Sequence, residues 1–280
     1  MPSFRYVVAD VFTDTPLTGN QLAVFTDARE IPEQTLLPLA REVGFSETVF
    51  VYPPEAGGHV RLRIFTPGRE IPFAGHPVLG AAFVLAVPLQ LTEIRLETGS
   101  GVVPVALERD AARIVFGSMS QPIPRVIAFP EPEPLLAALG VERSLLPVEL
   151  YDNGIGHAYV QLADVAAVEA LKPDLAALAR FPHVGTSCFA GSGDRWTTRM
   201  FAPGVGVPED PATGSAAGPL CVHLVRHGLV EPGVEITISQ GALIDRPSTL
   251  YARVEGAPDA IERVTVGGSA VIVARGEFRL

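Results

Sequence analysis

The sequence is poor in cysteine, which limits the kinds of protein that the chain can be. Cys188 and Cys221 are the two cysteines among its 280 residues, and residues so far apart build neither a disulfide framework nor a zinc knuckle. The chain has no Asn-X-Ser/Thr sequon, and its opening, MPSFRYVVADVF, lacks the basic start and apolar core of a signal peptide. We therefore expect a cytoplasmic protein.

Basic runs and long apolar runs are also missing. The formal net charge is -10 and the Lys and Arg residues are scattered, which argues against a nucleic acid or an anionic membrane as partner. The densest apolar run, near residues 80–89, is about ten residues long, whereas a membrane span needs about twenty. A small anionic ligand is still allowed, because a pocket can be locally positive in an acidic protein.

Several cofactor and nucleophile signatures are absent as well. There is no G-X-S-X-G elbow and no Walker sequence, and GSGDR at 191–195 lacks the spacing of a dinucleotide or phosphate loop. His223 and His227 are spaced i, i+4 as in a zincin helix, but position 224 is Leu instead of the required Glu. We therefore predict no cofactor and no metal.

The periodicity of the first half predicts a sheet with two helices. Strand patterns cover 6–12, 21–25, 46–52 and 59–67, and three more follow between 92 and 118. Residues 32–44 have helical spacing and end at Gly44. Residues 76–87 are apolar on nearly every face, which is typical of a buried helix.

The second half repeats this mixture. A short helix is predicted at 135–140 and a longer one at 163–173; strands are predicted at 146–151, 156–162, 183–190, 196–202, 235–239, 249–254 and 264–273. Strands outnumber helices, so we predict an α+β protein whose two lobes each curl a mostly antiparallel sheet around a central helix.

A proline-rich segment divides the chain. Residues 120–134 contain five prolines, which makes this segment the best candidate linker. A length of 280 residues also fits two domains of ordinary size. We predict lobes at 1–118 and 119–271, with a strand at about 272–280 that could return to the first lobe.

The two halves share a local signature. FTPGREIPFAGHPVLGAA begins at Phe65 and FAPGVGVPEDPATGSAAG begins at Phe201, so Phe-X-Pro-Gly-X-X-X-Pro recurs. Each copy then reaches a glycine at a predicted helix start, Gly75 or Gly214, if about three residues are inserted in the second copy. Coincidence is one explanation, but the matched strand, turn, glycine and helix favour duplication.

The duplicated helix starts are candidate anion sites. A helix start leaves about four N–H groups without partners and is the positive end of the helix dipole. Two such ends facing one cleft would bind a carboxylate. The small residues at 214–218 would let a ligand approach the backbone, although tight helix packing through Gly and Ala explains them too.

Four polar residues are candidates for chemistry. His76 and Ser215 lie at the two helix starts, and Asp210 precedes the second. Glu47 opens a strand suited to burial, where a raised pKa would let it give and take a proton. Each also has a structural explanation: helix-start packing for His76, capping for Asp210 and Ser215, and an exposed or Ser46-paired strand start for Glu47.

These segments together resemble a known family. DVFTDTPLTGNQLAVF, AREVGFSETVFV, RIFTPGREIPFAGHPVLG, MSQPIP, CFAGSGDRWTTRMF and EDPATGSAAGPLCVHLVRHG are similar, in this order, to the phenazine-biosynthesis isomerases (PhzF-like proteins) of the diaminopimelate epimerase fold. The similarity runs from about residue 5 to the C-terminus. One departure is Gln21, where many relatives have Pro.

The resemblance implies both an activity and its residues. It implies isomerisation of trans-2,3-dihydro-3-hydroxyanthranilate, with Glu47 as the proton carrier, His76 and Asp210 assisting, and Gly75, His76, Asp210, Gly214 and Ser215 binding substrate. It further implies two pseudo-symmetric lobes that close on a small carboxylate, a homodimer and no cofactor. The epimerases of this fold use a cysteine at each helix start, and this chain has none there.

Two alternatives stay open from the residues. One is an isomerase or epimerase for another small amino or cyclic acid. The other is a catalytically silent protein that binds small acids in the same pocket.

Overall fold

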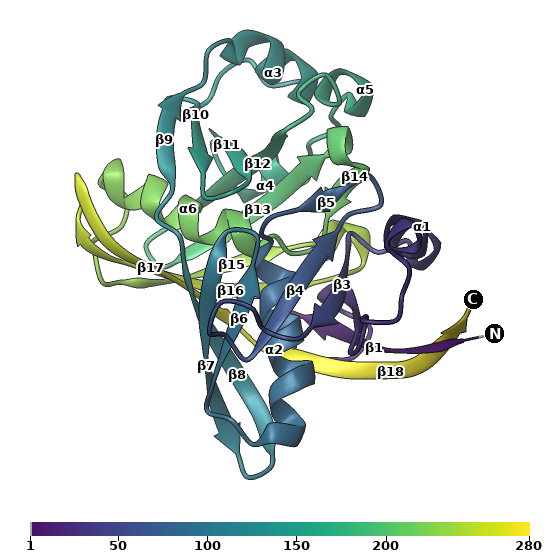
Figure 1. Ribbon diagram of the computed structural model, residues 1–280. Coiled ribbons are helices and arrows are strands. Elements are labelled where there is room, and N and C mark those ends of the chain that lie inside the picture. Colours follow the sequence, from purple (N-terminus) through teal and green to yellow (C-terminus); the bar gives the residue numbers. More distant parts are fainter. Residues whose placement is uncertain (1) are drawn as a thin grey trace. The chain divides into compact units, whose positions relative to one another are not determined.

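The computed structural model describes residues 2–280, apart from the side chains of Pro88 and Leu89. The chain forms an α+β protein with two compact units (Figure 1). Unit 1 comprises the residues up to Ser120 together with Gly267–Leu280, and unit 2 is Gln121–Val266. The sequence predicts these boundaries at 118/119 and 271/272.

Unit 1 is a sheet that curls around one helix. Its strands are β1 (Ser3–Val11), β2 (Asn20–Phe25), β3 (Glu47–Tyr52), β4 (Val60–Phe65), β5 (Glu70–Ile71), β6 (Glu93–Thr98), β7 (Gly101–Asp110), β8 (Arg113–Gln121) and β18 (Ala270–Arg279). The pairings give the order β18-β1-β2-β3-β4-β6-β7-β8, with β5 beside β4. The β2–β3 and β4–β6 pairs are parallel and the others are antiparallel.

The central helix of unit 1 is α2 (Gly75–Leu89), which contacts β1, β2, β3, β6, β7 and β18. Its apolar residues can be buried on every side because the sheet surrounds it, as the sequence predicts. A second helix, α1 (Glu33–Val43), buries Leu36, Leu39 and Ala40 and ends at Gly44 in the left-handed conformation. The sequence predictions for both helices are confirmed.

Unit 2 has the same plan. Its strands are β9 (Arg125–Ala128), β10 (Glu149–Asp152), β11 (Gly156–Gln161), β12 (Val184–Ser192), β13 (Arg195–Ala202), β14 (Val207–Asp210), β15 (Glu235–Gln240), β16 (Ser248–Ala257) and β17 (Ala260–Gly268). The order β9-β10-β11-β12-β13-β15-β16 repeats that of unit 1 from β18 to β7, and β14 lies beside β13 as β5 lies beside β4.

The central helix of unit 2 is α6 (Gly214–Arg226), which is buried from Gly214 to Val225. Three further helices, α3 (Pro132–Leu139), α4 (Val165–Glu169) and α5 (Leu175–Leu178), join a separate apolar cluster on this unit. Short 3-10 turns occupy Pro203–Val205 and Ala242–Ile244. The parallel pairs β11–β12 and β13–β15 match those of unit 1.

Three sequence predictions differ from the structure. The proline-rich segment is not only a linker, because Arg125–Ala128 pair with β10 as β9. The helix predicted at 163–173 is the five-residue α4, which ends at Ala170. The strand predicted at 264–273 is two strands, β17 and β18, with Ser269 between them, and the chain returns to unit 1 at Gly267.

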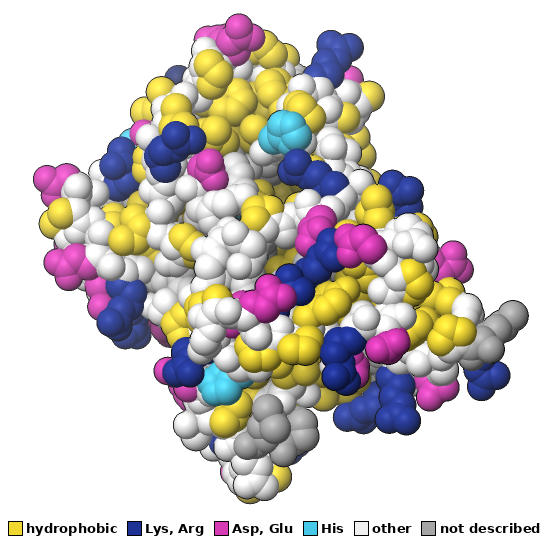
Figure 2. Space-filling model, viewed as in Figure 1, with side chains coloured by type: hydrophobic (Ala, Val, Ile, Leu, Met, Phe, Trp, Pro, Cys, Tyr) yellow, Lys and Arg dark blue, Asp and Glu magenta, His cyan; other side chains and the backbone are white. Residues whose placement is uncertain are grey.

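The surface carries mixed charge. Figure 2 shows Lys and Arg side chains interspersed with acidic and hydrophobic ones on the face in view. Among the described residues, no helix is long and apolar enough to cross a membrane.

Candidate active site

Helix α2 begins without a capping side chain. Its N-cap residue, Ala74, is extended and has no polar side chain, and the first turn contains no acidic residue. The amides that open this helix therefore receive no capping bond from Ala74, and they lie at the positive end of the helix dipole. Gly75 adds no bulk there. This end of α2 can accept an anionic group.

His76 is buried beside the start of α2 and contacts Glu47. Its side chain is 3% exposed, and Nδ1 lies 3.3 Å from Glu47 Oε2. Burial lowers the pKa of His76 to about 3, against a weaker opposing effect of a hydrogen bond to the Gln21 backbone. The imidazole is therefore neutral at pH 7 and can accept or donate a hydrogen bond without carrying a charge.

Glu47 is neither an exposed strand-start residue nor a partner of Ser46. Its side chain is 14% exposed, at the beginning of β3. The Ser46 hydroxyl instead donates to Asn20 Oδ1 at 2.9 Å, and Asn20 Nδ2 lies 3.3 Å from His76 Nδ1. Ser46 and Asn20 thus fix the ring of His76 next to the carboxylate.

The start of α6 in unit 2 is held by side chains from other strands. Asp210 is 4% exposed and its Oδ2 accepts the Thr213 hydroxyl at 2.6 Å. Gln240 Nε2 donates to the Asp210 carbonyl and to Thr213 Oγ1, at 2.8 and 2.9 Å. The capping alternative is thus partly right, because the Asp210 carboxylate orders the turn that precedes Gly214.

Ser215 is bonded to a buried histidine. Its Oγ lies 3.1 Å from His157 Nε2, and the two residues are 4% and 1% exposed. Burial lowers the pKa of His157 to about 4, which outweighs the attraction of Asp152. The imidazole is therefore neutral at pH 7 and fixes the orientation of the Ser215 hydroxyl.

Three more side chains hold the first carbonyls of α6. Gln121 Nε2 donates to Gly214 O at 2.7 Å, Asn153 Nδ2 donates to Ser215 O at 2.9 Å, and the Tyr159 hydroxyl donates to Ala216 O at 2.7 Å. Sequence reasoning missed these residues along with Asn20 and His157. The available signal was a polar residue at the start of an otherwise apolar strand, as in GNQLAVF and GHAYVQL.

The strand registers correct the alignment of the two copies. The repeated pattern matches Pro72 with Pro208. However, Ile64, which precedes Phe65, pairs with Ile71 in unit 1, and Met200, which precedes Phe201, pairs with Asp210 in unit 2. When Phe65 is matched with Phe201, Ile71 is therefore the equivalent of Asp210. Pro211 is then the equivalent of Pro72, and the extra residues of the second copy precede Glu209.

The same registers show where the copies diverge. Thr48 pairs with Phe65 and Thr186 with Phe201, so Gly185 is the equivalent of Glu47. His157 pairs with Gly185, and a Cβ on that glycine would lie 2.8 Å from His157 Nδ1. Unit 2 therefore has an imidazole on β11 where unit 1 has a carboxylate on β3.

The two cysteines have a structural role only, because both thiols are buried and protonated. Cys188 and Cys221 are both free and buried. Burial raises the pKa of each thiol to about 12, so neither is a thiolate at neutral pH.

A family comparison covers nearly the whole chain. The family described as phenazine biosynthesis-like protein matches residues 9–276. The chain belongs to this family.

Relatives of this phenazine biosynthesis-like protein match it over its full length. It is 48% identical to the trans-2,3-dihydro-3-hydroxyanthranilate isomerase of Pseudomonas aeruginosa and 47% identical to that of Pseudomonas chlororaphis, over 99% of both chains in each case. Among solved structures, a predicted epimerase from Pseudomonas aeruginosa shares 31% identity with a TM-score of 0.84, over 98% of this chain and 99% of that one.

The fold of this chain is also similar to that of a racemase. A probable proline racemase from Agrobacterium radiobacter superposes with a TM-score of 0.71, over 99% of this chain and 93% of that chain, at 12% identity. This likeness confirms the predicted epimerase-like fold.

Proposed function

We propose that this protein isomerises trans-2,3-dihydro-3-hydroxyanthranilate by proton transfer, without a cofactor. Three curated relatives from Pseudomonas carry the name of this isomerase at 46–48% identity over 99% of both chains. The observation that carries the proposal is the contact between the largely buried carboxyl group of Glu47 and the neutral ring of His76. A carboxyl group in that setting can act as base and then as acid.

Glu47 moves the proton. Its carboxylate takes a proton from C3 of the substrate ring and returns it to C1 on the same face, so that both double bonds of the ring diene shift by one position and Glu47 ends as it began. The resulting enol tautomerises to an aminoketone. General acid–base catalysis of this kind contributes about 10²–10⁴ in rate.

The start of each central helix is, by itself, a candidate binding site for the substrate carboxylate. We assign this role to the amides of Gly75, His76, Gly214 and Ser215, which open α2 and α6. Asp210 and His76 orient the amino and hydroxyl groups. The buried bond from His157 supports the role of Ser215, because a hydroxyl fixed before binding loses little entropy when it meets a ligand.

The test replaces Glu47 with the uncharged isostere. Glu47→Gln is expected to abolish turnover while substrate binding is largely kept, because the amide keeps the size of the side chain but cannot take the proton. Glu42→Gln, on the exposed face of α1, is the matched control and should turn over like the wild type. Consumption of the dihydro-hydroxyanthranilate is followed by absorbance, and the product is identified by NMR.

Three results decide between the alternatives. Turnover of Glu47→Gln near the wild-type rate would remove Glu47 from the mechanism. Binding of the dihydro-hydroxyanthranilate by the wild type without conversion would favour a silent binding protein. Neither binding nor conversion would indicate an isomerase for a different small acid.

We also propose that the protein works in the cytoplasm as a homodimer. Its two cysteines are free and buried, which suits a reducing compartment. Light scattering coupled to gel filtration should give about twice the chain mass of 29.7 kDa. A mass near that of one chain would refute the dimer.

A further inference from the structure

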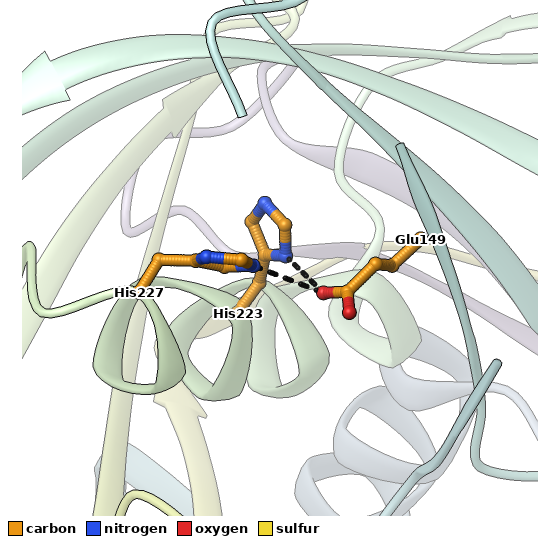
Figure 3. A group of neighbouring side chains, drawn as sticks. All are labelled: Glu149, His223 and His227. Carbon is orange, nitrogen blue, oxygen red and sulfur yellow. Dashed lines mark hydrogen bonds and ion pairs between the residues drawn. The ribbon is translucent and has the colours of Figure 1, made fainter. Parts of the chain in front are cut away.

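Two histidines at the end of α6 meet a glutamate from another strand. His223 and His227 project from the same face of α6, and Glu149 reaches them from β10 (Figure 3). The sequence pattern lacked a carboxylate because position 224 is Leu. The zincin Glu is a general base and not a ligand, whereas the fold places Glu149, from a segment distant in sequence, as a possible third ligand beside the two histidines.

Three polar groups converge on one oxygen of that glutamate. Glu149 Oε2 lies 2.8 Å from the Tyr151 hydroxyl, 3.0 Å from His227 Nε2 and 3.3 Å from His223 Nδ1. The Tyr151 hydroxyl and His227 Nε2 both bond this oxygen, and His223 Nδ1 also lies 3.0 Å from the Tyr151 hydroxyl. Its other oxygen has Arg226 at 3.6 Å.

The hydrogen-bond network leaves His223 incompletely satisfied. The side chain is fully buried, and its Nε2 finds no hydrogen-bond partner among residues 2–280. Whichever nitrogen carries the proton, one polar atom of the ring is poorly paired. Nδ1 is the ring nitrogen that faces Glu149 and Tyr151, so it is the atom that a metal ion would meet, with the ring proton on Nε2.

The spacing of the three ligand atoms fits a small cation. One nitrogen from each histidine and one carboxylate oxygen all lie within 4.8 Å of one another. Zinc bonds of about 2.0–2.1 Å place tetrahedral ligand atoms about 3.3 Å apart, close to the 3.0 and 3.3 Å found between Glu149 and the two rings. A small rotation of the partly exposed His227 would bring the two nitrogens closer.

We propose that Glu149, His223 and His227 bind one divalent transition-metal ion, with zinc as the best chemical fit. Two imidazoles and one carboxylate suit zinc and cobalt, whereas magnesium and calcium prefer oxygen ligands only. The side chains of Glu149 and His227 are 16% and 21% exposed, so the ion can enter and a water can complete its shell.

The ion has a structural role. His223 follows Ser215 by eight residues, which is about 12 Å along a helix. An ion there is too far from the start of α6 to touch a ligand bound at that start. Instead, it joins the C-terminal end of α6 to β10 and stabilises unit 2.

The test measures metal binding directly on the full chain after treatment with a chelator. Zinc added and then dialysed should remain at one equivalent by mass spectrometry of the metal, and cobalt should give the absorption of a tetrahedral site. Zinc should also raise the melting temperature. His227→Ala and Glu149→Gln should each weaken zinc binding at least about tenfold.

His183→Ala removes an exposed histidine of the same unit and should bind zinc like the wild type. Circular dichroism of each variant without metal shows whether it is folded. Less than one retained equivalent of zinc in the wild type, or unchanged affinity in a folded His227→Ala variant, would overturn the proposal. These readouts need no substrate, so their failure leaves the proposed isomerase activity untouched.

Discussion

Acid should destabilise this protein through buried histidines, and His157 allows the effect to be measured. Burial lowers the pKa of His157 from 6.5 to about 4. Between these two values the unfolded chain binds more protons than the folded one. The free energy of unfolding is therefore fully retained above pH 6.5 and falls as the pH drops toward 4.

The size of the effect follows from the two pKa values. One pKa unit corresponds to about 1.4 kcal/mol, so the step from pH 7 to pH 5 removes about 2 kcal/mol through His157 alone. His76, whose pKa is lowered to about 3, should remove a similar amount from unit 1. Together these losses are a large part of an ordinary protein's stability of about 5–15 kcal/mol.

The assay is urea unfolding at pH 7 and pH 5, followed by circular dichroism. His157→Gln should lose about 2 kcal/mol less between the two pH values than the wild type does, because glutamine does not titrate. The comparison is made within each variant, so a cost of the substitution at pH 7 does not affect it. The exposed His183→Gln is the matched control.

One result would refute this reasoning. If His157→Gln and the wild type lost equal stability between pH 7 and pH 5, His157 would not be a neutral residue buried in the folded state. The bond to Ser215 would then need another description.

Three further predictions concern residues around the start of α6. Gly218→Ala should lower the free energy of unfolding by about 1–3 kcal/mol in urea titrations, because its Cβ would clash with Gln121 Oε1 and with the side chain of Val264. Glu209→Gln should lower stability by about 1–3 kcal/mol by breaking the bidentate pair with Arg199, with turnover by the folded enzyme kept in the absorbance assay. Asp210→Asn should lower kcat/KM strongly while changing the free energy of unfolding only a little. If kcat/KM were unchanged, Asp210 would serve only to order its turn.

The central helices were accessible from the sequence because their signal is local. Consecutive residues in the sequence determine that α2 is apolar on all sides and that the two central helices start at Gly75 and Gly214. The same is true of α1, whose spacing ends at Gly44. Burial and period determine such elements, so a sequence pattern predicts them.

Half of the residues around the helix starts were not accessible in this way. His157 meets Ser215, and Gln121 meets Gly214, because strands far apart in sequence are placed beside α6. Glu149 reaches His223 for the same reason. Nothing within a few residues of these positions reveals the partner, since pairing across a sheet depends on register and topology.

The repeat illustrates the same limit at finer scale. Alignment by residue identity matches Pro72 with Pro208, because it places the repeated pattern without a gap. Backbone pairing instead makes Pro211 the equivalent. The correction matters chemically, because it sets Ile71 against Asp210. The match of Phe65 with Phe201, common to both alignments, sets Glu47 against Gly185, so each copy carries an acid where the other carries none.

The position of β18 has a consequence for synthesis on the ribosome. Ser3 pairs with Arg279, so β1 is flanked by a strand that is translated only after the whole of unit 2. Unit 2 is one continuous segment and can fold as soon as it emerges, whereas the sheet of unit 1 waits for its final strand.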